Sequence, residues 1–138
     1  MTPQNKTIAL FAAVAYVFAV PLSAVLWGWG ADAWLLLIAL VPSVIAMGWT
    51  KILFLRPRLQ TVPAFLRGGC VGLLSYLSFG VLAAVGLSLR SDGMASDLRE
   101  QLWYFLVVGT IMFGLPLTVV GAVTGVVAEK LFGRRSLS

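Results

Sequence analysis

The sequence predicts an all-α, polytopic membrane protein: a bundle of four transmembrane helices with both termini in the cytoplasm. Three observations predict this fold class. Of the 138 residues, 60% are hydrophobic and 11% are charged, whereas soluble domains carry about 25% charged residues. The apolar residues form four long uncharged runs, and the basic residues lie in the gaps between the runs. A bilayer can cover this much apolar surface, which a soluble domain of the same length cannot bury.

The first two runs predict a helical hairpin. We expect one helix at about 7–28 and a second at about 32–55. About 20 helical residues, at about 1.5 Å each, span the hydrocarbon layer of a bilayer. Asp32 is a suitable N-cap for the second helix, because its carboxylate can accept hydrogen bonds from free backbone N–H groups. Pro21 and Pro42 are expected to kink the two helices.

The last two runs predict a second hairpin, with helices at about 62–90 and 97–132, and the residues 1–138 are expected to form a single membrane domain. The uncharged part of the fourth run is longer than a bilayer requires. We therefore expect this helix to tilt or to kink at Pro116. Lys6 is the only basic residue before the first run, and no cleavage site follows the run. We therefore expect a retained helix rather than a signal peptide.

The positions of the basic residues predict the orientation. Two of the ten, Arg90 and Arg99, lie in the gaps assigned to the outside. Short cytoplasmic loops are rich in Lys and Arg, so both termini are expected in the cytoplasm, and the bacterial inner (plasma) membrane is the expected location. The cytoplasmic cations are Lys6, Lys51, Arg56, Arg58, Arg67, Lys130, Arg134 and Arg135. Aromatic residues expected at the outer interface are Trp27, Trp29, Trp34, Trp103 and Tyr104, and Trp49 is expected at the inner one.

The membrane runs contain little reactive chemistry. No ionisable residue other than tyrosine and cysteine occurs in 7–31, 33–50, 68–89 or 101–128, and the chain has no histidine. Ionisable residues at membrane depth mark proton relays and voltage sensors, and histidine is the commonest general base and metal ligand. We therefore expect no catalytic residue, no cofactor and no metal. Cys70 has no disulfide partner and is expected to be a small packing residue.

Small residues recur at helical spacing in the third and fourth runs. Pairs at i and i+4 allow two helix backbones to approach closely and gain van der Waals contact. Two interpretations are open: the stripes pack inside the bundle, or one faces outward and binds a partner or a second copy. The candidate packing and partner residues are Gly68, Gly72 and Ser75 in the third run and Gly114, Gly121 and Gly125 in the fourth.

Charged residues at the two ends of the bundle suggest further sites. The cytoplasmic cations Lys51, Arg56, Arg58 and Arg67 are candidates for binding anionic lipid head groups, although topology alone explains them. Because the cations lie at helix ends, the net charge of +5 does not indicate nucleic-acid binding. The outer gaps hold acidic residues that could pair in a catalytic or metal site, but most of them suit turns and helix caps. These acidic residues are Asp32, Asp92, Asp97 and Glu100.

Three classes of function follow. The missing chemistry and minimal loops favour a non-catalytic membrane protein that acts through helix–helix association, as an accessory or assembly subunit or as an immunity or inhibitor protein. Its expected partners are the lipid bilayer and either a membrane protein or a second copy of the chain. The first alternative is a small channel or carrier that encloses a path by oligomerising. The second alternative is a membrane enzyme that uses the outer carboxylates.

Overall fold

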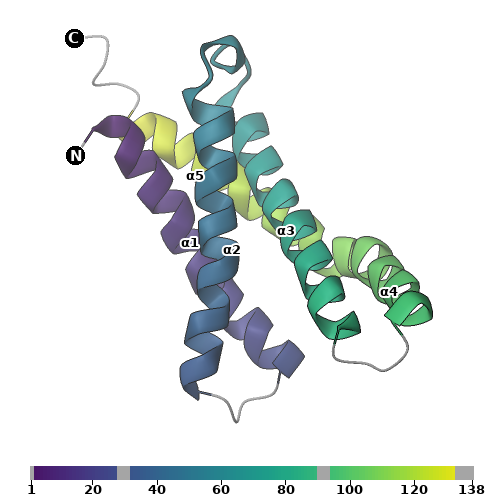
Figure 1. Cartoon of the computed structure of the whole chain (residues 1–138). Coiled ribbons are helices and arrows are strands. Elements are labelled where there is room, and N and C mark those ends of the chain that lie inside the picture. The colour runs from purple at the N-terminus through teal and green to yellow at the C-terminus, as the bar shows by residue number, and fades with distance from the viewer. Residues whose placement is uncertain (1, 28–31, 90–93, 133–138) are drawn as a thin grey trace.

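The computed structural model describes residues 2–27, 32–89 and 94–132, and every regular element in these ranges is a helix (Figure 1). The elements are α1 (Pro3–Trp27), α2 (Asp32–Leu55), a 3-10 turn (Pro57–Leu59), α3 (Ala64–Ser88), α4 (Met94–Trp103), two π-helical segments (Tyr104–Val108 and Thr110–Gly114) and α5 (Leu115–Phe132). Four helical stretches are long and apolar enough to cross a membrane. The expected all-helical class with four candidate membrane spans is confirmed, and these spans indicate integration into a membrane.

The helices are arranged around α3. The α1–α2 hairpin lies on one side of α3, α4 lies on the other side, and α5 crosses behind (Figure 1). The most extensive helix contact joins α3 to α5, and the next joins α1 to α2. The start of α1, the connection between α2 and α3, and the end of α5 all lie at one end of the bundle, which we call the terminal end.

The buried side chains are mainly small and many large apolar side chains are exposed, the reverse of the usual pattern in a soluble protein. Many of the buried side chains in the described part of the chain are alanines, and Ala39 and Ala84 are fully buried. Large apolar side chains face outward instead; Val44 and Val119 are each 64% exposed. Small residues let helices approach closely, and acyl chains can solvate the large ones. The packing therefore suits a lipid environment better than water.

A cluster of aromatic and aliphatic side chains packs near the terminal end. The rings of Phe11 in α1 and Phe54 in α2 lie 5.3 Å apart, at a tilted angle. Val71 in α3 and Ala128 in α5 are each 1% exposed and complete the cluster. Aromatic pairs at this spacing contribute beyond their buried area. The cluster joins all four spans at this end.

Hydroxyl groups connect neighbouring helices. The Ser43 hydroxyl of α2 donates to the Ala12 carbonyl of α1 at 2.8 Å. The Trp49 indole of α2 donates to the Ser78 hydroxyl of α3 at 3.1 Å. Trp49, expected as an anchor at the inner interface, is thus half-buried and joins two helices. The expected packing role of Cys70 is wrong: its side chain is exposed, because it lies on the side of α3 turned away from α5.

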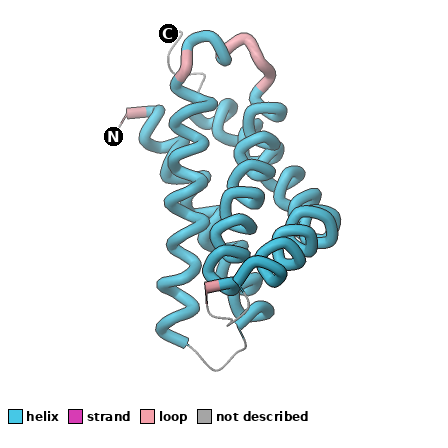
Figure 2. Tube along the Cα trace, turned by 45° about the vertical axis from the view of Figure 1, so that its right-hand side comes forward, coloured by secondary structure: helices cyan, strands magenta, loops and turns pink. Residues whose placement is uncertain are grey.

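The fourth span differs from the regular helix expected at about 97–132. Two π-helical segments separate α4 from α5, and the span turns at a corner there (Figure 2). The Gly109 N–H donates to the Tyr104 carbonyl, and the Leu115 N–H donates to the Thr110 carbonyl, each five residues back. Pro116 follows at once; it has no N–H and its ring crowds the preceding turn. The distortion expected at this proline is therefore spread over the residues before it. Pro21 and Pro42 lie inside α1 and α2, which continue through them.

Candidate functional site

Four glycines bring α3 and α5 into backbone contact. A Cβ atom added to Gly68 would lie 2.9 Å from the Cα atom of Gly125, and would also meet the Gly121 carbonyl oxygen. A Cβ atom on Gly72 would lie 2.9 Å from the carbonyl carbon of Leu117. No side chain fits at such distances, so the two backbones touch. We call Gly68, Gly72, Gly121 and Gly125 the glycine seam.

The glycine seam places the two small-residue stripes against each other. Gly121 and Gly125 face α3 of the same chain, and both are buried. The interpretation in which these two glycines face outward to bind a partner does not fit this packing. Any surface for a partner helix must therefore use other residues.

Tyr76 of α3 packs against the fourth span beside the glycine seam, at the point where this span bends. Its hydroxyl donates to the Phe105 carbonyl at 2.7 Å, in the first π-helical segment. Gly109 lies against the same hydroxyl, and a Cβ atom on Gly114 would lie 3.1 Å from the ring carbon Cδ1. Gly109 and Gly114, which have no side chains, thus leave the space that the Tyr76 ring and hydroxyl occupy. Sequence reasoning missed this role of Tyr76, because no local pattern shows which backbone carbonyl the π-helical segment leaves free to accept a hydrogen bond.

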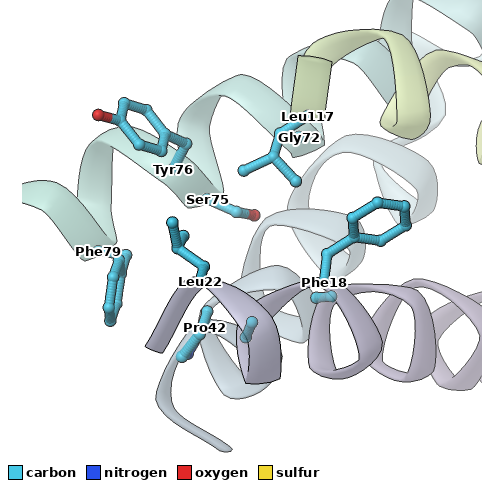
Figure 3. Close-up of a pocket in the computed structure, with 10 residues that line it drawn as sticks. Phe18, Leu22, Pro42, Gly72, Ser75, Tyr76, Phe79 and Leu117 are labelled. Atoms are coloured by element: carbon cyan, nitrogen blue, oxygen red, sulfur yellow. The ribbon is translucent and has the colours of Figure 1, made fainter. Parts of the chain in front are cut away.

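A small crevice lies between α1 and α3, within the candidate membrane spans (Figure 3). It holds about 50 Å³ of free space. We call it the Ser75 crevice. It is lined by two alanines of α1, by Gly72, and by the larger residues Phe18, Leu22, Pro42, Ser75, Tyr76, Phe79 and Leu117. The Ser75 hydroxyl oxygen points into this space (Figure 3) and, within the described part of the chain, has no hydrogen-bond partner. Ser75, selected from the sequence as a candidate packing or partner residue, therefore lies in a crevice beside the glycine seam.

The four cations selected as head-group ligands divide into two kinds. Lys51, Arg56 and Arg58 are exposed at the terminal end. Arg67 is half-buried, and its guanidinium carbon lies 4.7 Å from the centre of the Phe54 ring. Its Nε atom is buried without a hydrogen-bond partner in the described structure. Only Arg67 of the four is held in place by packing, a difference that charge patterns do not reveal.

The acidic residues at the opposite end form no site that the structure describes. Asp92 lies outside the described residues, and so do the side chains of Asp32 and Asp97. Glu100 is exposed. Among the described residues, no group of three or more His, Cys, Asp or Glu side chains could hold a metal ion. Comparisons with known protein families, curated protein sequences and solved structures found no match to this chain.

Proposed function

We propose that this chain is a non-catalytic integral membrane protein that acts by binding a transmembrane helix of another protein. Accessory or assembly subunits and immunity or inhibitor proteins work in this way. The Ser75 crevice carries the proposal. Ser75 is 8% exposed, and its hydroxyl lacks a partner in the described structure. Acyl chains cannot accept or donate a hydrogen bond, whereas a small polar residue on a neighbouring helix can.

The bend of the fourth span also supports a docking groove at the crevice. α1 packs against α2 and α5, whereas α4 packs against the far side of α3 (Figures 1 and 2). α1 and α3 keep exposed apolar side chains on either side of the crevice, and we call these two faces the docking groove. Phe18 of α1 is 44% exposed, and Leu82, two helical turns after Ser75, is 53% exposed. A helix lying along this groove could place a small polar side chain in the crevice.

The proposal also agrees with the chemistry available inside the membrane. The uncharged runs offer hydroxyl groups, and several of these bond within the bundle: Thr118 to Gly114 and Thr124 to Val120, each at one helical turn. Such groups stabilise helices and their contacts. Neither the channel or carrier alternative nor the enzyme alternative has a described arrangement of residues in its favour.

Photocrosslinking tests the docking groove. We expect a benzophenone amino acid in place of Phe18 to yield one discrete protein adduct in membranes of the native host, because the position faces the partner helix. The same probe at Val119, a lipid-facing position 64% exposed on α5, is the matched control and should yield lipid adducts only. Ser75→Leu, which fills the crevice, should abolish the adduct at position 18. Immunoblotting and mass spectrometry of the adducts measure the outcome.

Three outcomes would contradict this proposal. Equal protein adducts at positions 18 and 119 would show that contact is not confined to the groove. Lipid adducts alone at position 18 would leave the groove without a helix. An adduct at twice the mass of this chain would replace the other protein with a second copy.

The proposed orientation places the terminal end in the cytoplasm of a bacterial inner membrane. The excess of Lys and Arg at this end supports it. In a Cys70→Ala background, we expect Arg99→Cys to react with an impermeant maleimide in intact spheroplasts. Gln60→Cys, exposed in the connection between α2 and α3, should react only after lysis. The reverse pattern of labelling would invert the topology.

A further inference from the structure

A second, larger pocket opens at the terminal end. It encloses about 640 Å³ between the first turns of α1, the end of α2, the start of α3 and the last turn of α5. Its lining is divided by chemistry. Polar side chains come from Thr2, Gln4, Thr7 and Gln60, and apolar walls come from Ile8, Phe54 and Phe132. A pocket that is polar in part and apolar in part, at the end of a membrane bundle, suits a molecule with the same division.

Arg67 supplies the cation of this terminal pocket. The side chain lies over the Phe54 ring, and this cation–π contact fixes the guanidinium at the wall. The buried Nε atom has no hydrogen-bond partner, and no acidic side chain in the described structure forms an ion pair with Arg67. A guanidinium has five N–H donors in a planar fork, which matches the oxygens of a phosphate. Arg67 is thus positioned for a phosphate group.

Glu129 supplies an anion in the same pocket. It lies in the last turn of α5, where the helix dipole disfavours a negative charge. It forms no ion pair with a described residue, Arg67 included. Its neighbour Lys130 points elsewhere, because adjacent helical residues do not face each other. Helix stability therefore does not explain an acidic residue here, but a cationic group in the pocket would.

We propose that the terminal pocket binds the head group of a zwitterionic phospholipid with a primary ammonium, the chemistry of phosphatidylethanolamine. Arg67 holds the phosphate, and Glu129 accepts hydrogen bonds from the ammonium. Ile8 and Phe132 offer apolar contact to the glycerol and the first acyl carbons. A trimethylated ammonium has no N–H to donate, and a glycerol head group has no positive charge, so the pocket discriminates against both.

Native mass spectrometry of the detergent-solubilised protein tests this proposal. After exchange with an equimolar mixture of phosphatidylethanolamine, phosphatidylcholine and phosphatidylglycerol, we expect one bound phosphatidylethanolamine to dominate. Arg67→Gln should reduce this occupancy about tenfold, as expected for the loss of a charge-assisted hydrogen bond. Lys130→Gln is the matched control, because it also removes one cation. Lys130 is exposed in the last turn of α5, next to Glu129, and does not line the pocket. It should leave occupancy unchanged.

A second variant keeps the test valid if Arg67→Gln does not fold. Glu129 is exposed, so Glu129→Gln should melt like the wild type. It should also abolish the preference for phosphatidylethanolamine over phosphatidylglycerol. Equal loss of lipid in Arg67→Gln and Lys130→Gln, or an unchanged preference in Glu129→Gln, would overturn the proposal. Competition by soluble phosphoethanolamine at the same concentration as the lipid would overturn the lipid source and assign the pocket to a soluble phosphate.

Discussion

Replacing Gly68 with alanine is expected to destabilise the folded bundle by about 2–3 kcal/mol, the upper range for an overpacked core. The added methyl group would lie 2.9 Å from the Cα atom of Gly125 and would also meet the Gly121 carbonyl. Both contacts are with backbone, so no side-chain rotation can relieve them. The α3 and α5 helices would have to separate along the most extensive contact in the structure.

Reversible unfolding in mixed micelles, followed by circular dichroism, measures this effect. Gly48→Ala in α2 and Gly86→Ala in α3 are matched controls, because a Cβ atom at either position meets nothing within 4 Å. Each should be neutral or should stabilise its helix by up to about 1 kcal/mol. If Gly68→Ala costs no more than Gly48→Ala, the two backbones are not in contact as described.

This prediction also affects how partner binding is studied. A bulky residue at Gly121, such as leucine, would meet the Gly68 carbonyl and would separate the helices. Loss of partner capture in Gly121→Leu would therefore report a damaged fold and not a lost interface. Substitutions in the Ser75 crevice avoid this difficulty, because they fill existing space.

Replacing Gly109 with alanine is the second change with a large expected effect, again about 2–3 kcal/mol of lost stability. The new methyl group would meet the Tyr76 hydroxyl, which must then leave the Phe105 carbonyl. Tyr76→Phe alone should cost about 1 kcal/mol, because it removes one buried hydrogen bond. In the double variant the clashing oxygen is absent, and the remaining contact with the ring carbon Cζ is at 3.3 Å.

A double-mutant cycle measures this coupling. We expect the double variant to be more stable than the sum of the single effects by about 1 kcal/mol or more. The cycle of Gly86→Ala with Tyr76→Phe is the control and should be additive, because Gly86 has open space around it. Additive effects for Gly109 and Tyr76 would show that this tyrosine does not support the π-helical bend.

The sequence by itself determined the four spans. Transfer of a segment into a bilayer depends mainly on the sum of its own side chains, and each uncharged run is long enough to cross. The boundaries of α2 and the general position of the bend near Pro116 were predicted from local features: a candidate cap residue, a following Pro57 and a missing N–H. Local chemistry is visible in a sequence, so these features could be predicted.

Only the tertiary structure decided which faces meet. In a soluble protein hydrophobic periodicity marks the buried face, but in a membrane the buried and lipid-facing sides are both apolar. Glycine adds no side chain to indicate a direction, so the sequence left the stripe at Gly121 and Gly125 open to two interpretations. The expected packing role of Cys70, whose side chain is exposed, was wrong for the same reason.

The candidate sites could not be predicted for the same reason: they form where helices distant in the sequence meet. Residues of α1, α2, α3 and α5 line the crevice around Ser75, and none of those described bonds its hydroxyl. Arg67 shares a pocket with Glu129 because the start of α3 packs beside the end of α5. Arg67 and Glu129 are 62 positions apart in the sequence, and no local pattern relates them. The sequence determined what can enter the membrane, because that free energy is local; packing decided where the polar groups meet, because that depends on the contact of distant helices.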